Sequence, residues 1–175
     1  MKNVILTFCI LLGGMIPFNI SAVDILTVES PAFSAGGEIP AKYSCDNENV
    51  SPEIRWKGVP ITTKSLVLIC DDPDAPMGMW IHWVVYNIPT KINKLAENYA
   101  KHPIKGIIEG MTDFKKPGWG GPCPPNGIHR YFFKLYAVNI PTNYRNGLTK
   151  QNILDSIKGH VVGESSFFGT YMRKK

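Results

Sequence analysis

The sequence predicts a mainly β protein in which antiparallel sheets pack face to face, with a few peripheral helices. Short segments rich in β-branched and aromatic residues alternate with turns of proline, glycine and asparagine, a pattern typical of strands. Loops rather than regular helices separate these segments, which argues against a parallel sheet with crossover helices. The segments predicted to be strands are 25–28, 53–56, 66–70, 81–88 and 131–140.

One segment near the C-terminus has the pattern of an amphipathic helix. Thr149 is a candidate N-cap residue. The apolar residues that follow it at helical spacing are Ile153, Leu154, Ile157 and Val161. A closing strand is predicted over 166–172, where Gly169 marks a bulge or the close approach of another segment.

The chain of 175 residues is long enough for one domain with a sizeable core. Residues 1–22 are expected to be a secretory signal peptide, because a positive start precedes an uncharged apolar run that ends in small residues. An uncleaved membrane anchor is the alternative, and it is less favoured because the run is short and is interrupted by glycine and proline. Residues 23–175 would then form a single domain of a secreted or periplasmic protein, with no stable membrane span after cleavage.

The charge balance is mildly basic, since 19 lysines and arginines stand against 14 aspartates and glutamates. Part of the excess lies in Lys115–Lys116 and in the tail Arg173–Lys175, which we interpret as solvated surface. The sequence contains no long basic stripe with interleaved aromatic residues, so nucleic-acid binding is not expected.

Export would place the cysteines in an oxidising compartment, where thiols at a suitable distance pair. Cys45 and Cys123 both lie in turn-rich segments, whereas Cys70 ends an apolar strand and is expected to be an inert core thiol. We therefore predict a disulfide between Cys45 and Cys123, although spacing alone leaves the connectivity open. No metal site is predicted, because no two cysteines have the spacing of zinc ligands and the histidines lie far apart in sequence.

Two motifs contain most of the candidate chemistry, and the first combines the segments Asp71–Pro76 and Trp80–Trp83. Its prolines stiffen the loop that holds the aspartates. Regular alternation would place His82 on one face with Trp80, Val84 and Tyr86. A charged ring in such apolar surroundings needs an acidic partner. An aspartate of the preceding loop is the expected partner, and the pair would raise the pKa of the histidine. Taken alone, the motif also fits a turn in which the carboxylates accept backbone N–H bonds.

The second motif spans Gly120–Tyr131 and is expected to form the opposite wall of the same pocket. His129 and Tyr131 are two residues apart in a predicted strand, so they share a face and can present a ring N–H and a phenol hydroxyl together. The glycines allow a close approach of the backbone, and their amides can form an anion-binding nest. Arg130 would point the other way and is expected in a structural salt bridge.

Together these motifs resemble those of the phosphatidylethanolamine-binding protein family, in the bacterial branch often called Raf-kinase-inhibitor-like. The resemblance covers nearly all of the chain after residue 22 and runs through Cys45–Pro52, Asp71–Pro76, Trp80–Trp83, Asn87–Pro89, Gly121–Tyr131 and Gly169–Tyr171. It implies a β-sandwich with a small pocket for phosphate-like anions or phosphorylated head groups. The pocket positions that it implies are Asp72, His82, Gly121, Pro122, His129 and Tyr131, with Ala75 and Pro76 at the rim.

One departure from the family pattern lies close to this pocket. Lys115 stands where family members often have glycine after an Asp-Phe pair, which bears on the geometry of that loop and on the charge at the rim.

Three functions are compatible with these residues. The favoured one is non-enzymatic binding of a small anionic ligand, either a phosphate ester or a phospholipid head group, without a cofactor. The alternative is an inhibitor or modulator of another protein, a protease or a kinase, that acts through the pocket rim. A hydrolase with His82 or His129 as its base is least favoured, because the sequence has no Gly-x-Ser-x-Gly motif and no nucleophile beside a base.

Overall fold

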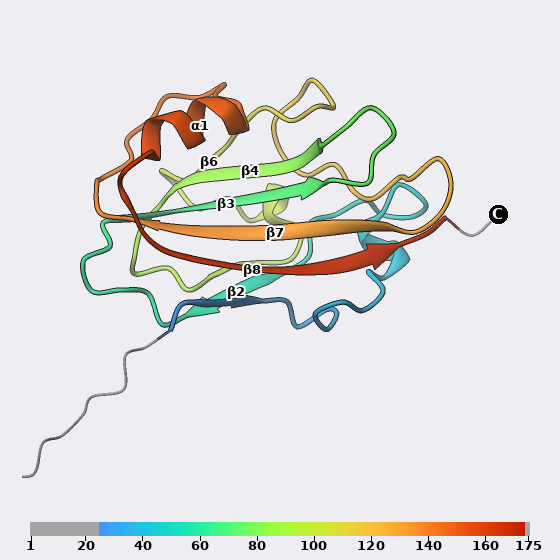
Figure 1. Cartoon of the computed structure of the whole chain (residues 1–175), viewed down its shortest axis with the longest axis horizontal. Helices are drawn as coiled ribbons and strands as arrows, with labels where there is room; N and C mark the ends of the chain where they lie inside the picture. The colour runs from blue at the N-terminus through green and yellow to red at the C-terminus, as the bar shows by residue number, and fades with distance from the viewer. Residues whose placement is uncertain (1–24, 174–175) are drawn as a thin grey trace, which may run out of the picture.

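The computed structural model describes residues 25–173 and contains two antiparallel sheets (Figure 1). The larger sheet has the strand order β6-β4-β3-β7-β8, and the smaller one has the order β1-β2-β5. The strands are β1 (Thr27–Glu29), β2 (Ile54–Lys57), β3 (Ser65–Asp72), β4 (Trp80–Ile88), β5 (Lys94–Leu95), β6 (Ile108–Glu109), β7 (His129–Val138) and β8 (Val161–Tyr171). The predicted mainly β class is confirmed, whereas the predicted signal peptide lies outside the described residues.

The five strands predicted within residues 25–140 are all present, with ends that differ by at most two residues from the prediction. The sequence pattern does not predict β5 and β6, because two residues are too few for a periodic signal. Two short 3-10 turns, η1 (Ala41–Tyr43) and η2 (Tyr99–Lys101), lie in the connections.

Strand β3 is the centre of the molecule, and every one of its residues is buried. Its alternate side chains face two separate apolar layers. Leu66, Leu68 and Cys70 join the core that the two sheets enclose, while Val67 and Ile69 face the layer under the helix α1 (Lys150–Ile157). Burying each such aliphatic side chain contributes about 1.5–3 kcal/mol, so β3 is held firmly from both sides.

Helix α1 begins where the sequence predicts. The side chain of Thr149 accepts a hydrogen bond from the backbone N–H of Asn152, and the Asn152 side chain accepts one from the N–H of Thr149. The helix ends earlier than predicted, because Gly159 has a left-handed backbone with φ of 79°. Val161 therefore does not extend the apolar face of the helix. It opens β8, which begins well before the predicted residue 166.

Strand β4 contains a bulge at His82 that the alternation rule does not foresee. Cys70 pairs with Trp83 and Asp71 pairs with Ile81, so His82 has no counterpart on β3. The extra residue turns His82 toward the same side as Trp83, where its ring lies 5.0 Å from that of Tyr131. The prediction that His82 shares a face with Val84 and Tyr86 is wrong, since those two residues pack under α1.

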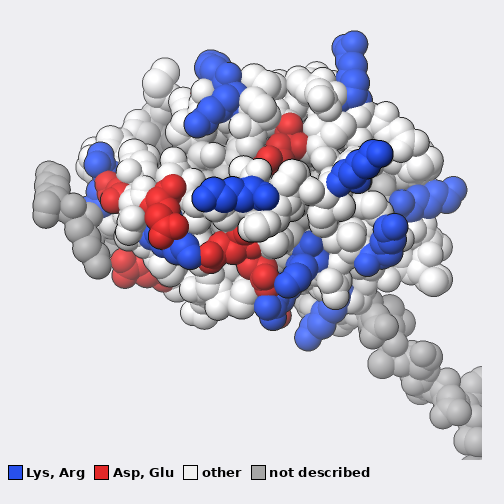
Figure 2. Space-filling view, turned by 180° about the vertical axis from the view of Figure 1, so that it is seen from behind, with Lys and Arg blue, Asp and Glu red and all other residues white. Residues whose placement is uncertain are grey.

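The described surface agrees with the charge pattern of the sequence. On the face shown in Figure 2, lysines and arginines stand apart from one another among acidic and uncharged residues and form no continuous stripe. Within residues 25–173, no helix has both the length and the apolar character needed to cross a membrane.

Candidate ligand-binding site

A cavity of about 470 Å³ opens at the end of the larger sheet where β3 ends and β4 and β7 begin. Because these strands are antiparallel neighbours, the last residue of β3 and the first residues of β4 and β7 meet at this edge. The polar residues that line the cavity are Asp72, His82, His129 and Tyr131, and the remaining ones are Ala75, Pro76, Met77, Trp80, Phe114, Cys123, Pro124 and Pro125. The cavity thus combines a small polar cluster with apolar walls.

Asp72 and His129 form a buried pair within this cluster. The Nδ1–H group of His129 donates to Oδ2 of Asp72 at 2.8 Å. The other carboxylate oxygen, Oδ1, accepts the backbone N–H of Asp74 at 2.8 Å. Asp72 therefore orients the ring of His129 and also fixes the start of the loop that follows β3.

His82 has a different partner from the one that the sequence predicts. Its Nδ1–H group donates to the backbone carbonyl of Gly120 rather than to an aspartate. The ring is also surrounded by aromatic side chains, with Phe114 at 5.3 Å and Tyr131 at 5.0 Å between ring centres. Burial lowers the pKa of His82 below its ordinary value of 6.5, and the Gly120 carbonyl and the charge of Asp72 only partly oppose this. The predicted Asp–His82 pair and the predicted rise of the pKa are both wrong.

Tyr131 is fully buried, and its hydroxyl group has no hydrogen-bond partner among the described residues. Burial raises the pKa of Tyr131, so the phenol keeps its proton at all physiological pH values. A buried hydroxyl without a partner costs about 1–3 kcal/mol. Tyr131 is one of the residues that line the cavity, and a phenol hydroxyl can both donate and accept a hydrogen bond.

The glycines before the disulfide serve the packing of the wall. The N–H of Gly121 donates to the side chain of Asn49 at 2.8 Å, and the N–H of Gly120 donates to the carbonyl of His82 at 2.9 Å. A Cβ atom on Gly121 would lie 2.2 Å from the carbonyl oxygen of Tyr43. The expected anion-binding nest from these two amides is wrong, because both are used within the protein. Gly121 and Pro122 are also not among the residues that line the cavity.

The predicted disulfide joins Cys45 to Cys123, and Cys123 lines the cavity. The N–H of Cys45 donates to the carbonyl of Pro122 at 3.0 Å, and this is the one hydrogen bond that the described structure gives to the backbone of residues 122–128. The disulfide is therefore the main tether of this wall. Cys70 is the free cysteine among the described residues, and burial raises the pKa of its thiol, as suits an inert core residue.

The opposite rim is the loop between β3 and β4. Arg130 binds Asp74 through two bonds, Nε to Oδ2 at 2.9 Å and Nη2 to Oδ1 at 2.7 Å, which confirms its structural role. These bonds hold the pKa of Asp74 down at about 2. Ala75 and Pro76 lie at the rim as the resemblance implies, followed by Met77, whose side chain is 93% exposed.

Most of the apolar wall of the cavity is not predicted from the sequence. Trp80, Pro124 and Pro125 lie inside the two motifs, so their positions were available as a signal. Phe114 comes from a separate loop, which is fixed when Asp113 accepts the backbone N–H of Ile81 at 2.8 Å. In this loop Lys115 has φ of 62°, a left-handed conformation that favours glycine and explains why glycine is common at this family position.

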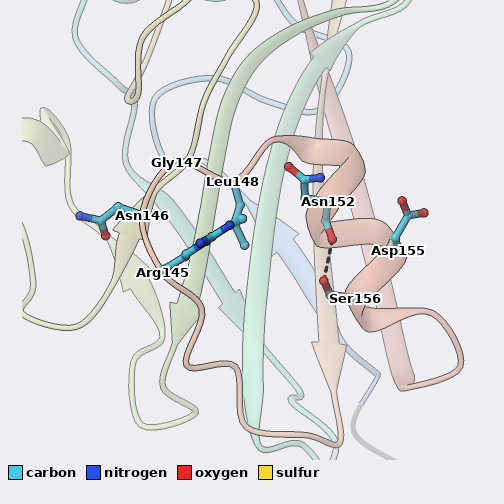
Figure 3. A pocket seen from close by; sticks show the side chains of 7 residues that line it. All are labelled: Arg145, Asn146, Gly147, Leu148, Asn152, Asp155 and Ser156. Atoms are coloured by element: carbon cyan, nitrogen blue, oxygen red, sulfur yellow. Dashed lines mark hydrogen bonds between the residues drawn. The ribbon is translucent and has the colours of Figure 1, made fainter.

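A second hollow of about 580 Å³ lies beside α1, and Figure 3 shows the residues that line it. They are Arg145, Asn146, Gly147, Leu148, Asn152, Asp155 and Ser156. Apart from the partly buried Leu148 these residues are exposed, and the bond drawn among them runs from the Ser156 hydroxyl to the carbonyl of Asn152. This second hollow is lined by no buried ionisable group among the described residues. Residues 25–173 also contain no cluster of three or more histidines, cysteines or carboxylates that could hold a metal ion.

Comparisons with known proteins agree with the resemblance. The sequence matches the family model described as phosphatidylethanolamine-binding protein over residues 29–172. A relative from Methanothermobacter thermautotrophicus, named UPF0098 protein, is 45% identical over 150 residues, which cover 85% of this chain and 99% of the relative. A protein of the same name from Aquifex aeolicus is 43% identical over 153 residues, covering 85% and 90%.

Two solved structures share the fold. A phosphatidylethanolamine-binding protein homologue from Chlamydia trachomatis gives a TM-score of 0.81 at 36% identity, over 86% of this chain and 99% of that one. YbcL of E. coli, described as a new member of the mammalian family, gives a TM-score of 0.78 at 29% identity, over 85% and 99%.

Proposed function

Because the chain belongs to the phosphatidylethanolamine-binding protein family, we propose that it binds a small anionic ligand, a phosphate ester or a phospholipid head group, in the cavity between β3, β4 and β7. The observation that carries this proposal is the buried Tyr131 hydroxyl without a partner. The Tyr131 ring lies 5.0 Å from that of His82, and within residues 25–173 the rings of His82 and His129 make their hydrogen bonds through Nδ1, not Nε2. These groups converge in one cavity and supply what a polar ligand needs.

The apolar walls suit the organic part of an ester. Trp80 and Phe114 are in edge contact at 5.6 Å, and Pro124 and Pro125 also line the cavity. A ligand with an anionic end and an apolar end would bury both ends in matching surroundings. A hydrogen bond to a charged phosphate oxygen contributes about 1.5–3 kcal/mol, more than a bond to a neutral group.

Binding without catalysis is part of the same proposal. Among the described residues that line the cavity there is no serine, threonine or lysine, and the single cysteine is held in a disulfide. A histidine base would therefore have no serine, threonine or cysteine nucleophile to activate. The disulfide also supports export to an oxidising compartment, secreted or periplasmic.

The rim supports a second candidate, a modulator of another protein. Met77, which lines the cavity, is 93% exposed, and Ile128, which directly precedes His129, is 64% exposed. Exposed apolar side chains of this kind are common in protein contacts. If this function is primary, an Ile128→Ser variant loses the protein partner and keeps its affinity for a small anion, because Ile128 does not line the cavity.

The test of the favoured function is calorimetric titration with phenyl phosphate. Tyr131→Phe removes the unpaired hydroxyl and nothing else, so we expect about tenfold weaker binding, which corresponds to about 1.4 kcal/mol. Thr142→Val is the matched control, because Thr142 has another buried hydroxyl without a partner but does not line the cavity. Equal affinities for the wild type and Tyr131→Phe would remove the proposal's main support.

A further inference from the structure

Both histidines of the cavity use Nδ1 inside the protein. His82 donates from Nδ1 to the carbonyl of Gly120, and His129 donates from Nδ1 to the carboxylate of Asp72. A carbonyl and a carboxylate oxygen only accept, so each Nδ1 must carry a proton. In a neutral imidazole the second nitrogen is then an acceptor. Two neutral histidines would thus offer lone pairs, not N–H donors, to an anion.

The groups around His82 strengthen this repulsion between an anion and the Nε2 lone pair. The acidic groups near the ring are Asp72 on β3 and Asp113 in the loop of Phe114, while Asp71 acts from the far side of β3. Tyr131 on β7 and the Gly120 carbonyl complete the polar groups around it. Among the described residues that line the cavity there is no lysine or arginine. No fixed positive side chain therefore compensates an anion at this point.

Asp72 does not relieve the repulsion between an anion and Nε2 of His82. Its two oxygens are already engaged by His129 and by the backbone of Asp74. If an anion oxygen contacted the unprotonated Nε2 of His82, a lone pair on each atom would face the other and the two would repel. The contact becomes attractive only when a proton lies between the two atoms.

We propose that the cavity binds its anion together with one proton from solvent, which lies between a ligand oxygen and Nε2 of His82. This inference rests on the proposed function and adds the protonation state in which the ligand is held. The proton adds to the Nε2 lone pair as an N–H group, or it remains a phosphate O–H that donates to that lone pair. No other bond forms or breaks, and binding lowers the concentration of free protons.

The experiment is calorimetric titration at pH 7.5 with phenyl phosphate and with phenyl sulfate, in buffers that differ in ionisation enthalpy. The phosphate ester has a second pKa of about 6 and is mainly a dianion at this pH. The sulfate ester has no second proton to gain, so a proton taken up with it must go to the protein. We expect net uptake approaching one proton for each probe, and affinities that fall about tenfold for each further pH unit.

The position of the proton is read from the ring itself. In ¹⁵N-labelled protein saturated with phenyl sulfate, we expect Nε2 of His82 to change from a lone-pair nitrogen to a protonated one. His82→Gln should bind with no proton uptake and with an affinity independent of pH. His160→Gln should keep the full uptake, because His160 is exposed and hydrogen-bonds Asn139 away from the cavity.

The outcomes separate the two proposals. Binding of both probes without proton uptake overturns the inference and leaves the proposed function in place. Uptake with an unchanged Nε2 signal of His82 also overturns it, because the proton then lies on another group. The NMR measurement keeps the test decisive if His82→Gln does not fold. If neither probe binds, the proposed function itself fails.

Discussion

Asp72 controls two parts of the cavity with its two oxygens. Oδ2 orients the His129 ring, and Oδ1 fixes the backbone of the rim loop at Asp74. We expect Asp72→Asn to weaken binding of phenyl phosphate by about tenfold, because the amide cannot replace the charge-assisted bond to the ring, which is worth about 1.5–3 kcal/mol. Asp155→Asn on the exposed side of α1 is the control for the lost charge. Tighter binding by Asp72→Asn would show that the carboxylate only repels the anion.

His82 also links stability to pH. Burial lowers its pKa in the folded state, so the unfolded chain binds the proton more readily. The contribution of the neutral ring to stability is complete above about pH 6.5 and is lost as the pH falls from there toward the folded-state pKa. Urea unfolding of the ligand-free protein should show a fall in unfolding free energy over this range, and the fall should be smaller in His82→Gln. The same pH slope in the wild type and in His82→Gln would contradict this assignment.

At the scale of elements, the site depends on irregular features of two strands and a loop. The bulge in β4 brings His82 into the cavity, and the motifs could not reveal it, since it depends on the register between β3 and β4. The predicted pairing of His82 with an aspartate is wrong for the same reason. Once His82 turns toward the Gly120 carbonyl, the carboxylate is left to His129. By contrast, the stiff loops, the disulfide and the role of Arg130 followed from local residue types.

The wall from Pro122 to Ile128 depends on the disulfide more than on hydrogen bonds. The bridge spans 78 residues, so Cys123→Ser should lower the unfolding free energy by about 2–4 kcal/mol through the added freedom of the unfolded chain. Chemical unfolding measures this loss. Titration of the variant should also show weaker binding of phenyl phosphate, because Cys123, Pro124 and Pro125 line the cavity.

The control for this prediction is the buried cysteine. Cys70→Ala removes a core thiol but leaves the bridge intact, so it should lower stability with little change in affinity. If Cys123→Ser binds phenyl phosphate as well as the wild type does, the bridge supports the fold and not the cavity.

At the scale of the whole molecule, the central strand β3 places two adjacent carboxylates on opposite faces of the sheet. Asp72 points into the cavity, whereas Asp71 is fully buried on the opposite face. The antiparallel class and the capped helix were predictable, because strand and cap signals are local. The two-residue strands and the length of β8 were not, because pairing with distant segments defines them.

Asp71 links several elements on the face of the larger sheet that α1 covers, here called the outer face. Its carboxylate binds Nζ of Lys134 on β7 at 2.8 Å and Nζ of Lys150 at the start of α1. Lys150 also reaches the sulfur of Met79 in the rim loop at 2.8 Å. One buried carboxylate thus connects the helix, two strands and the loop that borders the cavity. This arrangement predicts that the two lysines act together.

Substituting methionine for one lysine at a time should therefore be tolerated better than substituting both. Lys134→Met or Lys150→Met leaves Asp71 with one cation, so we expect each to lower the unfolding free energy by only about 0.5–1.5 kcal/mol, the contribution of one typical hydrogen bond. The double variant leaves a buried charge without a partner, which alone costs about 3–5 kcal/mol. A double-mutant cycle measured by urea unfolding should give a loss larger than the sum of the single losses. Strict additivity would mean that each lysine binds Asp71 independently, and the outer face would not be the single electrostatic unit that these contacts describe.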